Sequence, residues 1–76
     1  MITKKIKLGN IREVEAFNQI CSKFTCDMDL SSGKYYVNAK SIMGIFSLDL
    51  EMPLKLMADT DDEAAIEEAF KEFLCS

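Results

Sequence analysis

Ser41 is the residue whose type and position suggest the clearest chemistry. Val37 to Ala39 is typical of the end of a strand, and Ser41 falls where a short helix over residues 41–48 would begin. A serine hydroxyl at this position accepts a hydrogen bond from a backbone N–H two or three residues further on, which the helix cannot satisfy internally. The sequence therefore predicts a helix cap at Ser41 before any other role.

The helix predicted after this serine is apolar on more than one side. At 100° per residue, Ile45 and Leu48 fall on one side, whereas Ile42, Met43 and Phe46 spread around the other. One core cannot enclose all five side chains, so we expect a small apolar patch at the surface beside a hydroxyl. Such a patch is typical of a docking site for another protein. The alternative is that Ile42, Met43 and Phe46 pack into the core.

Three cysteines, Cys21, Cys26 and Cys75, are the other candidate nucleophiles and metal ligands. An odd number excludes complete internal pairing, and free cysteines are among the most buried residues, so we expect thiols in the core or tail. A zinc site would need more ligands than Cys21 and Cys26, and the sequence contains no histidine. We therefore expect no metal and no cofactor.

The net charge of −4 comes partly from acidic residues near the C-terminus, namely Asp59, Asp61, Asp62, Glu63, Glu67 and Glu68. Calcium would need a defined loop of oxygen ligands with a glycine turn, so we interpret these acids as the solvated start and face of a helix. Thr60 to Glu63 has the pattern of a capping box at that start.

Composition also limits the partners. No basic stretch is concentrated enough to follow a phosphate backbone, which argues against nucleic acid. No apolar run approaches the ~20 residues of a membrane span, and the first residues lack the core of a signal peptide. We expect a cytoplasmic protein with no membrane partner.

Hydrophobic periodicity predicts alternating strands and helices. Strands are expected over residues 2–8 (interrupted at Lys4), 25–30, 35–39 and 52–58, with a hairpin turn over 31–34. The first helix is expected to begin after a cap at Asn10 and to bury Ile11, Val14, Phe17, Ile20, Cys21 and Phe24. The last is expected to bury Ile66, Ala69, Phe70, Phe73 and Leu74. The order βαββαβα predicts an α+β open-faced sandwich, with a four-stranded antiparallel sheet and three helices on one face, forming one domain over residues 1–76.

Two segments carry a family resemblance. Ser22-Lys23-Phe24 and the run from Val37 to Leu48, which includes Lys-Ser-Ile-Met-Gly, closely resemble the histidine-containing phosphocarrier protein family, HPr, of the bacterial sugar phosphotransferase system. The resemblance implies the HPr fold and a regulatory serine at Ser41 that an HPr-kinase type enzyme phosphorylates. We expect Lys40, Ile42, Met43, Phe46 and Arg12 to contact a partner.

The resemblance fails at the family's phosphorylation site. The family carries phosphate on a histidine in the motif Gly-Leu/Ile-His-Ala-Arg-Pro, whereas this sequence contains no histidine. Counting back from Ser41 puts Asn10 opposite that histidine and Arg12 opposite the motif's arginine, while counting from the first strand indicates a shortened loop. An asparagine amide cannot accept and release a phosphoryl group. Arg12 at a helix start could bind an anion, although Glu13 beside it favours a plain exposed charge.

Three functions follow from these observations. The first, which we expect, is a regulatory binding module switched at Ser41, similar to the HPr paralogue that acts as a corepressor in catabolite repression; its partner would be an HPr-kinase type enzyme or a transcriptional regulator. The second is an interaction protein that binds a partner or a second copy of itself without phosphate. The third is an enzyme or phosphocarrier that uses a cysteine, which we disfavour because no histidine activates Cys21.

Overall fold

The computed structural model describes residues 1–75, and these form four strands and three helices in the predicted order βαββαβα. Along the chain they are β1 (Ile2–Ile6), α1 (Ile11–Ser22), β2 (Met28–Ser32), β3 (Tyr35–Asn38), α2 (Ile42–Phe46), β4 (Leu54–Ala58) and α3 (Glu63–Phe70). Within this described part, no helix combines the length and apolar character that crossing a membrane requires.

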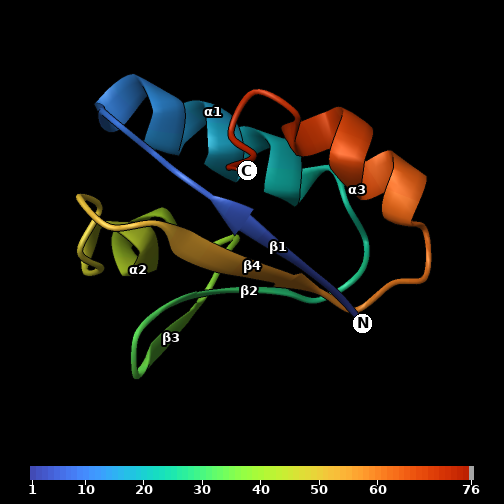
Figure 1. Ribbon diagram of the computed structural model, residues 1–76, viewed down its shortest axis with the longest axis horizontal. Helices are drawn as coiled ribbons and strands as arrows, with labels where there is room; N and C mark the ends of the chain where they lie inside the picture. Colours follow the sequence, from blue (N-terminus) through green and yellow to red (C-terminus); the bar gives the residue numbers. More distant parts are fainter. Residues whose placement is uncertain (76) are drawn as a thin grey trace.

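The strands form one antiparallel sheet in the order β1-β4-β2-β3. Figure 1 shows α1 and α3 lying across one face of this sheet, with α2 beside β3 and β4. Alternate strand residues are therefore enclosed or exposed: Leu30 and Leu56 are fully buried under the helices, whereas Lys5 and Lys55 are exposed on the opposite face. The fold class predicted from the sequence is confirmed.

Aromatic side chains join the helices to each other in the core. The ring of Phe17 on α1 lies 5.2 Å from that of Phe70 on α3 and 6.0 Å from that of Phe73. Phe24 stacks on Phe70 at 5.8 Å. The remaining fully buried side chains include Leu8, from the loop between β1 and α1, and, from the helices and strands, Ile6, Val14, Cys21, Met28, Leu30, Ile45, Leu54, Leu56 and Ile66.

The predicted hairpin exists, but its strands and turn differ from the predicted bounds. β2 begins at Met28 rather than residue 25 and continues through Ser31 and Ser32, which face Tyr36 and Tyr35 across the pair. The turn therefore shrinks to two residues. Gly33 supplies the positive φ of 59° that such a tight connection demands, so serines that resemble turn residues can remain in the strand.

The helix starts were predicted with mixed success. Asn10 caps α1 as expected, but Ile11, predicted to be buried, is 64% exposed at the first position of the helix. The cap of α3 is Asp62 and not Thr60: Asp62 Oδ1 accepts from the Ala65 N–H at 3.1 Å. The Thr60 hydroxyl instead accepts from the Asp62 N–H at 3.2 Å and orders the preceding turn. α3 ends at Phe70, so Phe73 reaches the core from beyond the helix.

Lys4, the interruption in the first strand, has a structural explanation. Its side chain lies on the helix-covered face, where Nζ pairs with Glu63 at 2.8 Å and Glu67 at 3.1 Å. Hydrogen bonds to these two carboxylates raise the pKa of Lys4. Glu63 and Glu67, interpreted from the sequence as solvated, have side chains that are 60% and 51% exposed and are also ion-paired.

Candidate functional site

Ser41 is the predicted cap of α2. Its Oγ accepts from the Gly44 N–H at 3.3 Å, and its own N–H donates to the Asn38 carbonyl at 2.9 Å, which joins the end of β3 to the helix. A side chain at Gly44 would press on Val37, because a Cβ built there lies 3.2 Å from the Val37 Cβ. The short helix can thus lie close to β3 while the Ser41 residue stays exposed.

The side chains of α2 and the residues after it divide into buried and exposed groups, as the helical spacing predicted. Ile45 is fully buried and Leu48 is 7% exposed, whereas Met43 is 76% exposed and Phe46 is 40% exposed. Ile42 is half-buried against the core. The core-packing alternative is therefore wrong for Met43 and Phe46 and partly right for Ile42. We call Met43 and Phe46, with the exposed edge of Ile42, the α2 patch.

Lys40 has a structural role that the sequence did not reveal. Its half-buried ammonium donates to the Phe24 carbonyl at 2.6 Å, and its own carbonyl accepts from Asn18 Nδ2 at 2.9 Å. These contacts fasten the start of α2 to α1. The Lys40 ammonium thus points into the fold, which does not favour the predicted contact of Lys40 with a partner. Nothing in the sequence indicated the Asn18 hydrogen bond, because Asn18 lies among the polar residues of a helix.

The start of α1 is closed by its own side chains. Asn10 Oδ1 accepts from the Glu13 N–H at 2.9 Å, and the Glu13 carboxylate accepts in turn from the Gly9 N–H. Two donors that an anion could have used are therefore occupied. Arg12 is exposed, and none of the side-chain hydrogen bonds or ion pairs found within residues 1–75 involves it.

The cysteines are all free thiols, with Cys21 buried and Cys26 and Cys75 half-buried. Burial raises the pKa of Cys21 to about 12 even though the positive charge of Lys40 acts in the opposite direction. A thiol with so high a pKa carries almost no thiolate at neutral pH and is a poor nucleophile. Across residues 1–75, no three His, Cys, Asp or Glu side chains are grouped closely enough to hold a metal ion.

A family model described as the PTS HPr component phosphorylation site matches residues 5–76. The chain belongs to the HPr family. Solved HPr structures agree: HPr-C-His from Thermoanaerobacter tengcongensis is 34% identical, with 95% of this chain and 89% of that chain covered at a TM-score of 0.78. HPr from Bacillus anthracis, 24% identical with 97% and 96% covered, has a TM-score of 0.73 and bears on the fold alone.

Crh, the Bacillus subtilis catabolite repression protein, is also similar, at 30% identity over 93% of this chain and 88% of that chain, with a TM-score of 0.65. Crh and an HPr from Thermoanaerobacter tengcongensis that is 35% identical are both described as dimers. A comparison with curated proteins gives no match.

Family membership makes this chain a phosphocarrier-like protein of the phosphotransferase system and not an enzyme, and it confirms the expected cytoplasmic location. The phosphorylation of Ser41 and the partner contacts of Lys40, Ile42, Met43, Phe46 and Arg12 stay predictions. So does the position of Asn10 opposite the family histidine.

Proposed function

We propose that this protein is a regulatory, protein-binding member of the HPr family that does not relay phosphate through histidine and is switched by phosphorylation of Ser41. One observation carries the proposal: the exposed Ser41 stands at the head of the same short helix that projects Met43 and Phe46 into solvent. A partner that covers this helix would contact the hydroxyl and the apolar side chains together.

The chemistry at the start of α1 supports the absence of a relay. The sequence has no histidine to accept a phosphoryl group. A phosphate at the start of α1 would also meet the Glu13 carboxylate, which already holds the Gly9 N–H. Cys21 offers no replacement, because burial raises its pKa to about 12 and keeps it protonated.

Phosphorylation of Ser41 would act on a partner and not on the fold. A phosphate adds about −1.5 to −2 charges at neutral pH, and its oxygens can still accept from the Gly44 N–H that Ser41 Oγ binds now. The new charge would lie beside the α2 patch, where a partner with a basic group next to an apolar recess would sense it. The similarity to Crh, which is described as a catabolite repression protein, supports a transcriptional regulator as that partner. The partner that adds the phosphate would be an HPr-kinase type enzyme.

Incubation with an HPr-kinase type enzyme and ATP, followed by peptide mass spectrometry, tests the switch. One phosphate should appear on Ser41 and should be absent from the Ser41→Ala variant. Ser47→Ala is a matched control, because the Ser47 hydroxyl is also exposed near α2 but donates to the Gly44 carbonyl at 2.6 Å. An unmodified Ser41, or label on another residue, would contradict the proposal.

The absence of a relay has its own assay. The protein should take no label from phosphoenolpyruvate through the general phosphotransferase enzyme, under conditions that label an HPr with an intact histidine. Label on any side chain of this protein would show that it carries phosphate after all.

A second candidate is an interaction module that needs no phosphate, and the 76% exposure of Met43 favours it. Because relatives are described as dimers, a second copy of the chain is a natural occupant of the α2 patch. Sedimentation analysis of the unphosphorylated protein would then show a dimer that Met43→Ala and Phe46→Ala weaken without unfolding the monomer. A monomer at all concentrations would exclude this form of the candidate.

A further inference from the structure

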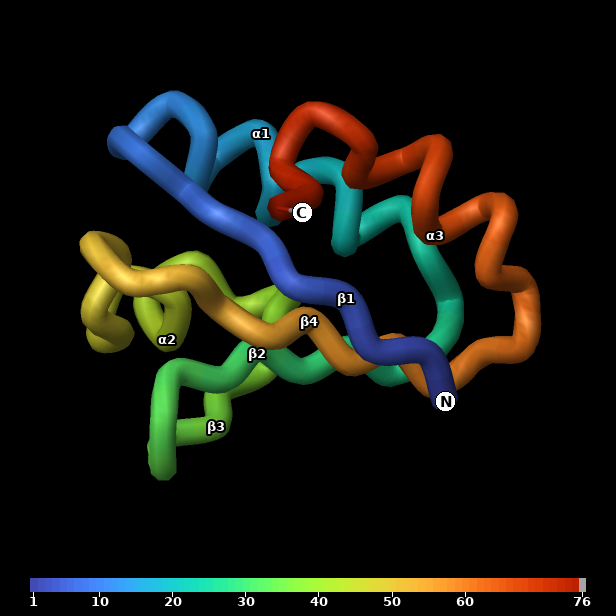
Figure 2. Tube along the Cα trace, viewed as in Figure 1, coloured from blue at the N-terminus to red at the C-terminus, as the bar shows by residue number. Residues whose placement is uncertain are grey.

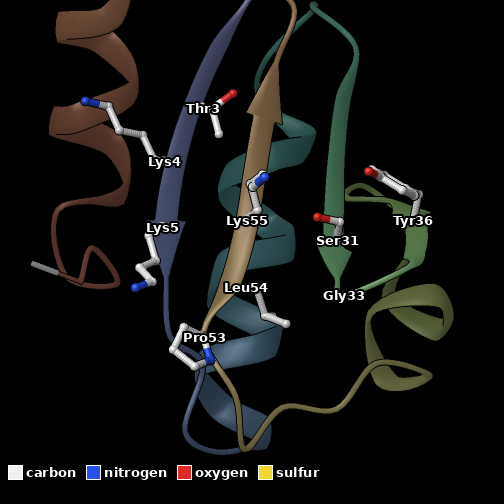
Figure 3. A pocket seen from close by; sticks show the side chains of 9 residues that line it. All are labelled: Thr3, Lys4, Lys5, Ser31, Gly33, Tyr36, Pro53, Leu54 and Lys55. Carbon is white, nitrogen blue, oxygen red and sulfur yellow. The ribbon is translucent and has the colours of Figure 1, made fainter.

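The face of the sheet away from α1 and α3 contains a hollow of about 320 Å³. Figure 3 shows this face with the residues that line the hollow, namely Thr3, Lys4, Lys5, Ser31, Gly33, Tyr36, Pro53, Leu54 and Lys55. The Lys4 side chain itself points the other way, toward α3. Figure 2 shows α1 and α3 on one side of the trace of β1 and β4, with β3 on the other side. The hollow is thus separate from the start of α1.

Strand register brings one polar row across the hollow. Lys5 faces Lys55, Lys55 faces Ser31, and Ser31 faces Tyr36, so that all four strands contribute one residue. Like charges directly opposite each other destabilise a sheet. In a protein with a net charge of −4, these two facing lysines put two positive charges on neighbouring strands. Figure 3 shows the Lys55 ammonium over the sheet and the Lys5 ammonium turned toward the outer side of β1.

Lys5 and Lys55 also lack the ion pairs that neutralise the neighbouring Lys4. Lys4, on the other face of β1, is paired with Glu63 and Glu67. Neither Lys5 nor Lys55 forms an ion pair with any carboxylate within residues 1–75. Asp29 lies on the same face but one row away, opposite Met57, and does not line the hollow. The charge of Lys5 and Lys55 is therefore available to an anion.

Ser31 supplies a hydroxyl at the base of the hollow. The residue is only 6% exposed, and within residues 1–75 no hydrogen bond involves its hydroxyl. Figure 3 shows this hydroxyl turned toward β4 and the Tyr36 hydroxyl turned toward β2. Within residues 1–75 no fully buried side-chain oxygen or nitrogen lacks a hydrogen-bond partner, so the unpaired Ser31 hydroxyl retains some accessible surface and can donate to a group in the hollow.

We propose that this hollow binds the phosphate group of a small organic phosphate ester. Lys55 and Lys5 supply positive charge, Ser31 and Thr3 supply hydroxyl donors, and the oxygens of a phosphate dianion can accept from several of these groups at once. The Tyr36 ring, 67% exposed at the rim, would cover the organic part. This site is independent of Ser41 and gives the protein a small-molecule ligand in addition to its protein partner.

A two-dimensional NMR titration with phenyl phosphate tests the site. Backbone amides of Thr3, Ser31, Tyr36 and Lys55 should shift and saturate, and inorganic phosphate should move the same amides more weakly and spare Tyr36. Lys55→Gln should weaken binding about tenfold, because it removes one charge-assisted hydrogen bond. Lys23→Gln, which removes an equal charge from the exposed end of α1, should leave affinity unchanged.

Each opposite result overturns the proposal. Shifts that never saturate, or that centre on α1 or α2, would place the anion elsewhere. Equal weakening by Lys55→Gln and Lys23→Gln would mean general attraction to positive charge. Equal affinity for inorganic phosphate and phenyl phosphate would mean that Tyr36 does not contact the organic part of the ligand. Ser31→Ala provides a second variant, because it deletes the hydroxyl without changing the charge and should also weaken binding.

Discussion

The Asn10 side chain and the Glu13 backbone are joined by a 2.9 Å hydrogen bond, in which the Glu13 N–H donates to Asn10 Oδ1. The Glu13 carboxylate accepts from Gly9, so the two residues close the first turn of α1 from both sides. Within residues 1–75, side chains of the same turn therefore occupy both of these backbone donors.

Removal of this cap should cost stability. We expect Asn10→Ala to lower the free energy of unfolding by about 1 kcal/mol, because it leaves the Glu13 N–H without its partner. Urea denaturation measures the change. Gln19→Ala removes another exposed amide from the same helix and should change stability far less. Equal losses in the two variants would contradict the cap.

Two phenylalanines distinguish the core from the α2 patch. Phe17 is fully buried and contacts the rings of Phe70 and Phe73, so we expect Phe17→Ala to cost about 3–5 kcal/mol. Phe46 is 40% exposed, and Phe46→Ala should cost much less. Denaturant unfolding of both variants makes the comparison. A loss at Phe46 as large as that at Phe17 would mean that Phe46 is a core residue.

Cys21 should make stability fall at alkaline pH. Burial raises its pKa from 9.0 to about 12, so between these values the unfolded chain releases the thiol proton while the folded chain keeps it. The unfolded state then binds fewer protons, and stability declines by at most about 1.4 kcal/mol per pH unit. Unfolding of the native protein and of Cys21→Ala between these pH values should show a shallower decline in the variant. Identical slopes would refute the assignment.

Substitution of Gly33 should lower stability only because of the backbone conformation at this position. Its φ is 59°, and no atom lies within 4 Å of the position a Cβ would occupy. Gly33→Ala should therefore cost about 1 kcal/mol through the left-handed conformation, without any steric clash. Gly33→Asn should cost less, since asparagine tolerates this conformation better. Thermal unfolding ranks the two variants, and an alanine variant as stable as the native protein would contradict the strain argument.

The elements that the sequence predicted well are those fixed by local rules. Asn10 and Ser41 were recognised as caps because cap chemistry depends on the residue and its next few neighbours. The separation of Ile45 from Met43 followed from helical geometry, since a short helix against one sheet can bury only one side.

The features that were missed depend on partners distant in sequence. Lys4 looked like a flaw in a strand because Glu63 and Glu67, which neutralise it, lie about sixty positions away. Ser31 looked like a turn residue because its strand pairing becomes evident only when β2, β3 and β4 are assembled. The hollow on the open face could not be predicted for the same reason.

The last described residues have a consequence for how molecules meet each other. The Lys7 N–H donates to the Phe73 carbonyl, and the Cys75 N–H donates to the Lys5 carbonyl. These bonds place the last described residues along the outer side of the C-terminal half of β1. Lys4 stands at the centre of β1, and lysine discourages strand addition at such an edge. A strand from another molecule would thus add to the sheet at β3, the strand at the opposite edge. Pairing there would stop at two molecules and could not propagate into a fibre.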